Sequence, residues 1–221
     1  VNFRPKDQSG VPNYKEPSIY QERLTRPEGD EVVAELRRGD RWTPFQTHDL
    51  LVNLEHLDKL EIDYRMLALF RNPIDNAYSR WKRGWGERFG TDPRAFTLTF
   101  EKKGMPLPWY CLDCKENCGG LNPMEQCIHR VCCLTRRTVI QYKKAKERNR
   151  IHVLTFEDFA QFPHQELERV CSFLGTWPTS HTENFIRKAR CPRVIDPADR
   201  QKKLQEFKAS VSQEIFNELV A

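Results

Sequence analysis

The feature that most constrains the fold is the junction between a short apolar run and a basic helical pattern at residues 64–85. The run at residues 66–70 reads MLALF, and Arg71-Asn72-Pro73 follows it directly. Pro73 disfavours helix at Asn72 but fits the first turn of a helix, because a prolyl nitrogen has no N–H to leave unsatisfied. The junction therefore predicts a buried strand, a sharp turn and a helix start, where α/β proteins often bind an anion.

A second junction of the same kind lies at residues 151–158, where IHVLTF is followed by Glu157-Asp158. Helical patterns precede, separate and follow the two strands. They cover residues 28–38, 49–60, 123–148, 165–174, 182–190 and 200–220. Strands that alternate with helices indicate an α/β fold, with a parallel sheet flanked by helices. A chain of 221 residues is long enough for one such domain, over residues 1–221.

Composition narrows the choice of partners. The net charge is +5, from 36 Lys and Arg against 31 Asp and Glu, which is too mild for a typical nucleic-acid binder but suits an anionic small ligand. No run of 18 or more apolar residues occurs, so we expect no membrane span in this chain. The first residues are polar and lack an initiator Met, so we expect a preceding segment.

Two side chains at the first junction could hold a phosphate group. Arg71 follows the strand directly and offers a forked pair of donors, and Ser79 offers a hydroxyl about two turns into the helix. The residues alone also allow a structural interpretation. In that interpretation Arg71 pairs with Asp75, and Ser79 is an exposed helix residue.

A resemblance favours the phosphate interpretation. The pattern Arg71-Asn72-Pro73-x-Asp75-x3-Ser79 resembles the 3′-phosphate motif of sulfotransferases that use 3′-phosphoadenosine 5′-phosphosulfate. Thr47-His48 resembles the Thr-His of the cytosolic branch, at a separation from Arg71 close to that family's spacing. The segment VLTFEDF at residues 153–159 resembles the family's later strand and helix start. The resemblance covers about residues 45–175.

The resemblance implies a three-layer fold like that of the P-loop NTPases, and in-line transfer of a sulfuryl group without a metal. His48 would be the catalytic base, and Arg71 and Ser79 would bind the nucleotide 3′-phosphate. The co-substrate would be 3′-phosphoadenosine 5′-phosphosulfate. The acceptor would be a hydroxyl on a carbohydrate, a protein or a small molecule.

The chain departs from the family's pattern in three places. The loop that grips the 5′-phosphosulfate is not recognisable, and Pro5-Lys6 and Ser9-Gly10 lack the flanking strand and helix that such a loop needs. We therefore expect a domain incomplete at its N-terminus, and an inactive nucleotide-binding or interaction module is the alternative function. Phe156 stands where the family usually has Tyr, so that hydroxyl is absent. Arg187-Lys188 resembles a late phosphate-binding pair, but Ala189 replaces the expected Gly, which favours a solvated helix face.

Residues 104–133 form a Cys-rich stretch that we interpret as an insertion near the acceptor side. Its six cysteines are Cys111, Cys114, Cys118, Cys127, Cys132 and Cys133, with His129 nearby. Disulfides, free thiols and a zinc site all remain open, because the Cys-x2-Cys spacing at the start is not repeated later. Disulfides would place the protein in the Golgi lumen or secretory pathway, and free thiols would fit the cytoplasm.

Overall fold

The computed structural model describes residues 44–60, 62–87, 99–102, 104–112 and 120–221. The chain divides into two compact units, one formed by Val1–His48 and Gly90–Phe96 and the other by Asp49–Phe89 and Thr97–Ala221. Every described helix and strand belongs to the second unit. The helix predicted at residues 28–38 and the residues around Lys6 lie outside the described part.

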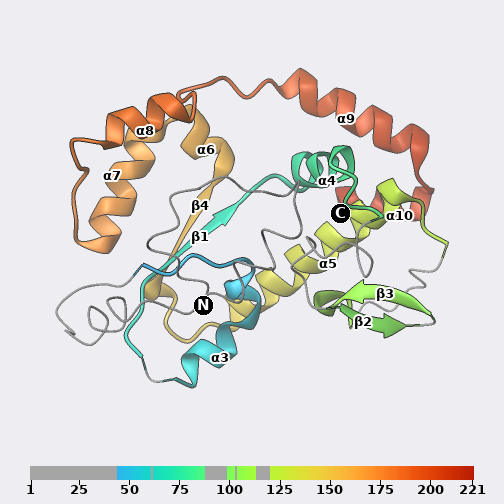
Figure 1. The fold of residues 1–221 in the computed structure, drawn as a ribbon, viewed down its shortest axis with the longest axis horizontal. Coiled ribbons are helices and arrows are strands. Elements are labelled where there is room, and N and C mark those ends of the chain that lie inside the picture. The colour runs from blue at the N-terminus through green and yellow to red at the C-terminus, as the bar shows by residue number, and fades with distance from the viewer. Residues whose placement is uncertain (1–43, 61, 88–98, 103, 113–119) are drawn as a thin grey trace, which may run out of the picture. The chain divides into compact units, whose positions relative to one another are not determined.

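The two strands predicted from the apolar runs pair with each other in parallel. Strand β1 (Met66–Phe70) lies beside β4 (Ile151–Thr155), in a register that matches their first residues and their last residues. Figure 1 shows β1 leading into helix α4 (Pro73–Lys82) and β4 leading into helix α6 (Phe156–Gln161). The parallel pairing is therefore confirmed for these two strands, while the full three-layer arrangement stays a prediction.

Helices pack against this pair of strands, but Leu67, Leu69 and Val153 remain exposed. Up to residue 188, the described helices are the 3₁₀-helices η1 (Leu50–Asn53), η2 (Trp109–Cys111) and η3 (Arg148–Arg150), and the α-helices α3 (Leu54–Asp58), α4 (Pro73–Lys82), α5 (Pro123–Lys144), α6 (Phe156–Gln161), α7 (Pro163–Leu174) and α8 (Thr182–Lys188). One face of the sheet packs on η1, α3 and the end of α5. On the other side, His152 of β4 stacks on Phe173 of α7 at 5.3 Å between ring centroids.

Helix α5 is the central helix of the unit, and its first half is buried on several sides. A capping box starts it. The Asn122 side chain accepts hydrogen bonds from the backbone N–H groups of Met124 and Glu125, and Glu125 Oε2 accepts one from Asn122 N at 2.9 Å. The first half of the helix carries Cys127, His129 and Cys133, so residues 123–133 of the Cys-rich stretch form part of the core.

The rest of the Cys-rich stretch contains a strand that the sequence did not predict. Strand β2 (Thr99–Lys102) and β3 (Met105–Pro108) form an antiparallel hairpin around Gly104, whose φ is +76°. Two prolines in β3 argued for a loop, because proline cannot donate to a sheet ladder. A two-stranded hairpin leaves each strand one unpaired edge, where proline is tolerated. Leu107 and Tyr110 then anchor this hairpin on α5.

The single helix predicted at residues 200–220 is wrong, because two helices cover this segment. Helix α9 (Pro197–Ser210) and α10 (Gln213–Val220) are separated by Val211 and Ser212 in extended conformation. Glu125 Oε1 accepts a hydrogen bond from Ser212 N at 2.8 Å, so a carboxylate distant in sequence stabilises the break. The predicted apolar stripe is retained, because Phe207, Ile215 and Leu219 are all buried. Among the described helices, none is both long and apolar enough to cross a membrane.

Candidate functional site

The candidate site lies where β1 and β4 end side by side. The last residues of the two strands, Phe70 and Thr155, are register partners, so Arg71 and Phe156 both follow at the same sheet edge. Each is immediately next to a helix start, since α4 begins at Pro73 and α6 at Phe156. The two predicted junctions therefore meet in space.

Local capping explains the sharp turn after each strand. Asn72 Oδ1 accepts a hydrogen bond from Ile74 N at 3.0 Å, and Pro73 occupies the first helical position of α4. Thr155 Oγ1 accepts one from Asp158 N at 3.0 Å and caps α6. This cap ends β4 one residue earlier than the apolar pattern predicted. Glu157 Oε1 joins the two turns by accepting a hydrogen bond from Asn72 N at 3.0 Å.

Two arginines share one aromatic ring at this edge. The guanidinium carbons of Arg71 and Arg193 each lie 5.0 Å from the centroid of the Phe156 ring, within the range of a cation–π contact. The two groups cannot be farther apart than twice that distance. Both side chains are exposed, and no carboxylate among the described residues forms an ion pair with either. Two cations with no counter-ion in the described part of the chain, on a half-buried aromatic ring, favour an anionic ligand.

Arg193 is the site residue that the sequence reasoning missed. It lies between Pro192 and Val194, outside any helical or strand pattern. Its backbone N–H donates to the Ala160 carbonyl in α6 at 2.8 Å, which brings it beside Phe156. The only sequence signal was its place in a basic segment that begins at Arg187, and that segment resembles the family's late phosphate-binding pair. Arg187 and Lys188 themselves are exposed on α8, as the solvated-face prediction required.

The structural alternative for Arg71 is wrong, because Asp75 has other partners. Asp75 Oδ2 accepts hydrogen bonds from Arg200 Nε at 3.2 Å and from Arg200 Nη2 at 2.9 Å. Its Oδ1 accepts one from Lys203 Nζ at 2.8 Å. Burial would raise the pKa of Asp75, but these hydrogen bonds and charges outweigh it and hold the pKa below its usual value. Arg71 therefore keeps its guanidinium available.

Ser79 lies on α4, the helix that follows the turn containing Arg71. It is half-buried, seven residues beyond the N-cap Asn72, so it lies almost two turns along α4 on nearly the same face. Within the described residues, the Ser79 hydroxyl makes no hydrogen bond. His48 is exposed and belongs to the other compact unit, so its relation to this edge stays a prediction.

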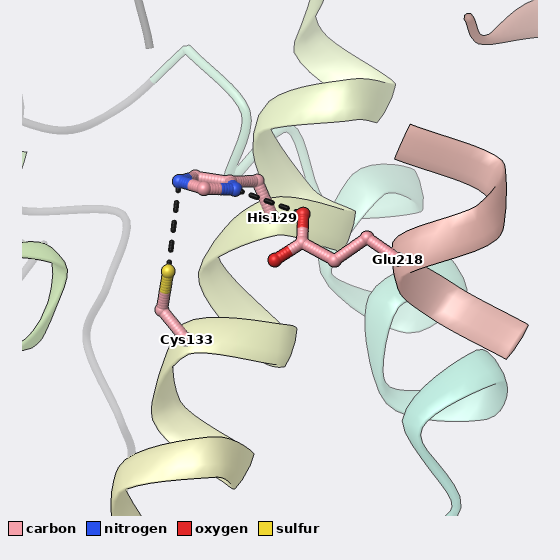
Figure 2. Close-up of side chains that lie close together, drawn as sticks. All are labelled: His129, Cys133 and Glu218. Carbon is pink, nitrogen blue, oxygen red and sulfur yellow. Dashed lines mark hydrogen bonds and ion pairs between the residues drawn. The ribbon is translucent and has the colours of Figure 1, made fainter. Parts of the chain in front are cut away.

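A separate cluster on α5 joins the C-terminal helix to the core. Figure 2 shows the ring of His129 between the sulfur of Cys133 and the carboxylate of Glu218. His129 Nδ1 lies 3.0 Å from Glu218 Oε2, and its Nε2 lies 3.5 Å from Cys133 Sγ. Within the described residues, these three form the one group of potential metal ligands, with ligand atoms within 4.8 Å of one another. A metal would take only one ring nitrogen, whereas here each nitrogen faces a different residue.

The cysteines fall into two groups by burial. Cys111 and Cys127 are buried, and Cys132, Cys171 and Cys191 are half-buried. Cys133 is not among the free thiols. No disulfide joins two described cysteines, and residues 113–119, which carry Cys114 and Cys118, lie outside the described part. The choice between disulfides, thiols and zinc for the whole cluster stays open.

The comparison with protein families decides the class of the chain. The model of the sulfotransferase domain matches residues 13–191. The chain belongs to the sulfotransferase domain family. This sulfotransferase-family chain matches no curated protein and no solved structure. The matched range includes Arg71, Ser79 and Phe156, and it ends two residues before Arg193.

Proposed function

We propose that this chain is a sulfotransferase that binds 3′-phosphoadenosine 5′-phosphosulfate at the common edge of β1 and β4. The observation that carries the proposal is the pair of guanidinium groups, Arg71 and Arg193, on the ring of Phe156. Neither has a carboxylate partner among the described residues. In a chain of the sulfotransferase family, a cationic pair at this strand edge fits the 3′-phosphate of the donor nucleotide.

The phosphate would gain directional hydrogen bonds as well as charge neutralisation. Each guanidinium group offers a fork of N–H donors that matches two oxygens of a phosphate. Ser79 adds a hydroxyl from the same face of α4. Phe156 lacks the hydroxyl that Tyr would offer, but its ring still supports the two arginine side chains and limits the directions they can take.

The reaction that follows from this binding is transfer of a sulfuryl group to a hydroxyl. The acceptor oxygen forms a bond to sulfur, the bond from sulfur to the bridging phosphate oxygen breaks, and adenosine 3′,5′-bisphosphate leaves. A base must take the acceptor proton, and we propose His48 for this role because of its resemblance to the Thr-His pair. A His48→Ala protein that binds nucleotide normally but keeps full transfer activity would rule this assignment out.

Calorimetric titration with adenosine 3′,5′-bisphosphate tests the binding site. We expect Arg71→Ala and Arg193→Ala each to weaken nucleotide binding, raising the dissociation constant by about 10- to 100-fold, since a hydrogen bond to a charged group contributes about 1.5 to 3 kcal/mol. Ser79→Ala should weaken it less. Arg83→Ala is the matched control, because Arg83 is an exposed arginine at the other end of α4. A wild-type protein that is folded but does not bind the nucleotide would overturn the proposal.

A second candidate function is a nucleotide-binding module without transfer activity. The observation in its favour is the missing recognisable 5′-phosphosulfate loop. Radiolabelled donor distinguishes the two functions when it is incubated with carbohydrate, tyrosine-peptide and small phenol acceptors. Label transferred to any acceptor hydroxyl supports the enzyme, and nucleotide binding without transfer to any of them supports the module.

The proposed compartment depends on the cysteines. Disulfides in the stretch at residues 104–133 would support the Golgi lumen or secretory pathway, since such bonds persist in oxidising compartments. The mass of the protein alkylated in denaturant, measured with and without prior reduction, counts them. A mass that corresponds to eight alkylated thiols without reduction would instead support the cytoplasm.

A further inference from the structure

We propose that Asp75 is a positioning residue that holds the C-terminal segment against α4 and so keeps Arg193 beside Arg71. This inference rests on the proposed nucleotide site and explains how a residue 122 positions later in the chain becomes part of it. Asp75 is only 7% exposed, in the first turn of α4. Both of its oxygens are occupied by the side chains of α9.

The hydrogen-bond partners of Asp75 indicate that it has a structural role rather than a role in binding the ligand. Lys203 Nζ lies 2.8 Å from Asp75 Oδ1 and 2.5 Å from Asp199 Oδ2. Arg200 Nη2 lies 2.9 Å from Asp75 Oδ2 and 3.8 Å from Glu157 Oε1. Arg200 and Lys203 are thus neutralised by carboxylates. Arg71 and Arg193, in contrast, have no carboxylate partner among the described residues.

The same network reaches the turn that carries Arg71. Glu157 Oε1 accepts a hydrogen bond from Asn72 N, the residue next to Arg71, and also lies near Arg200. Asp75 and Glu157 therefore place Arg200 between the start of α4 and the start of α6. Any movement of the first turn of α9 would change both carboxylate contacts.

The segment that joins Arg193 to α9 is short, and hydrogen bonds from backbone N–H groups hold both of its ends. Asp196 caps α9 by accepting a hydrogen bond from Ala198 N at 2.8 Å, and Pro197 occupies the first helical position. Two residues separate this cap from Arg193, whose own N–H is bonded to the Ala160 carbonyl. Fixing the start of α9 therefore restricts where the Arg193 guanidinium group can lie.

The second half of α9 has an anchor of its own. Phe207 is fully buried, and Tyr78 donates a hydrogen bond to Glu206 Oε2 at 2.8 Å. Loss of the Asp75 contacts should loosen the start of α9 without detaching the helix. Glu206→Gln is thus a matched control, because Glu206 also joins α9 to α4 but lies farther from Arg193.

Calorimetry on the full chain tests the inference. We expect Asp75→Asn to weaken binding of adenosine 3′,5′-bisphosphate about tenfold, and Glu206→Gln by less than about twofold. In an Arg193→Ala background, Asp75→Asn should weaken nucleotide binding by less than a further twofold or so, because both substitutions remove the same contact between Arg193 and the nucleotide. Equal loss in both backgrounds, or no loss from Asp75→Asn alone, would overturn the positioning role.

A measurement without ligand separates this inference from the proposed function. We expect hydrogen exchange of the peptide covering residues 190–199 to become at least about threefold faster in Asp75→Asn and to stay unchanged in Glu206→Gln. Arg200→Gln should behave like Asp75→Asn and serves if the latter does not fold. Unchanged exchange in these variants overturns the inference, whereas a wild-type protein that fails to bind the nucleotide overturns the proposed function instead.

Discussion

Replacing Asp75 by asparagine should cost stability that depends on pH in a specific way. The substitution keeps the shape of the side chain but removes the charge that faces Arg200 and Lys203. Breaking a buried ion pair from one side costs about 3 to 5 kcal/mol. Here the Arg200 side chain is 29% exposed, which lowers the loss, and an asparagine carbonyl can still accept one hydrogen bond. We therefore expect a loss of about 2 to 3 kcal/mol at pH 7.

The sign of the pH dependence follows from the lowered pKa of Asp75. Its contribution to stability is fully present above the unfolded pKa, which is about 3.9, and is lost as the pH falls through the lower folded pKa. The raised pKa of Lys203 extends the same window upward to its unfolded value of about 10.4. The difference between wild type and variant should thus be constant from about pH 5 to pH 9 and should shrink below about pH 4.

Urea unfolding followed by tryptophan fluorescence measures this difference. Titrations of both proteins at pH 7, 5, 4 and 3 give the free energy of unfolding under each condition. The Glu206→Gln variant serves as the control, because Glu206 is a more exposed carboxylate on the same helix pair. A difference below about 0.5 kcal/mol at pH 7, or one that is as large at pH 3 as at pH 7, would show that the Asp75 ion pairs do not stabilise the fold in this way.

Three further predictions follow from the packing. Phe156→Leu should weaken nucleotide binding about fivefold in calorimetry, because two cation–π contacts of about 0.5 kcal/mol each are lost, while Phe156→Tyr should bind normally. Burial raises the pKa of Cys127 to about 11 and of Cys132 to about 12, so mass spectrometry should find both almost unalkylated by iodoacetamide at pH 8 until the protein unfolds. Gly86→Ala should destabilise the fold by about 1 to 3 kcal/mol in urea unfolding, since a Cβ there would lie 2.1 Å from the Pro123 carbonyl oxygen. An unchanged unfolding midpoint would contradict the last prediction.

The sequence predicted the first junction accurately because local rules determine it. A five-residue apolar run followed by Asn72-Pro73 predicted a short strand and a helix start, and β1 and α4 begin where this pattern places them. The strand is buried on one face only, because Leu67 and Leu69 are exposed. The strand at residues 151–155 was predicted one residue too long. The strand ends where the Thr155 side chain caps α6, and this hydrogen bond cannot be deduced from the spacing of apolar residues.

Features that depend on distant residues were not predictable in this way. The break between α9 and α10 has no proline or glycine, and it is stabilised by Glu125 from another helix. Arg193 has no motif of its own and reaches the site through a backbone contact to α6. Phe156 was interpreted as a lost hydroxyl, while the fold gives its ring a positive role as the support of two guanidinium groups.

Recognition of the 3′-phosphate by Arg71 and Arg193 can be measured in a cycle of two ligands and two proteins. Calorimetry gives the affinities of wild type and of the Arg71→Ala/Arg193→Ala double variant for adenosine 3′,5′-bisphosphate and for adenosine 5′-monophosphate. We expect wild type to prefer the 3′-phosphorylated ligand by about 100-fold and the double variant to prefer it by less than about threefold. A folded double variant that keeps the full preference would contradict the claim.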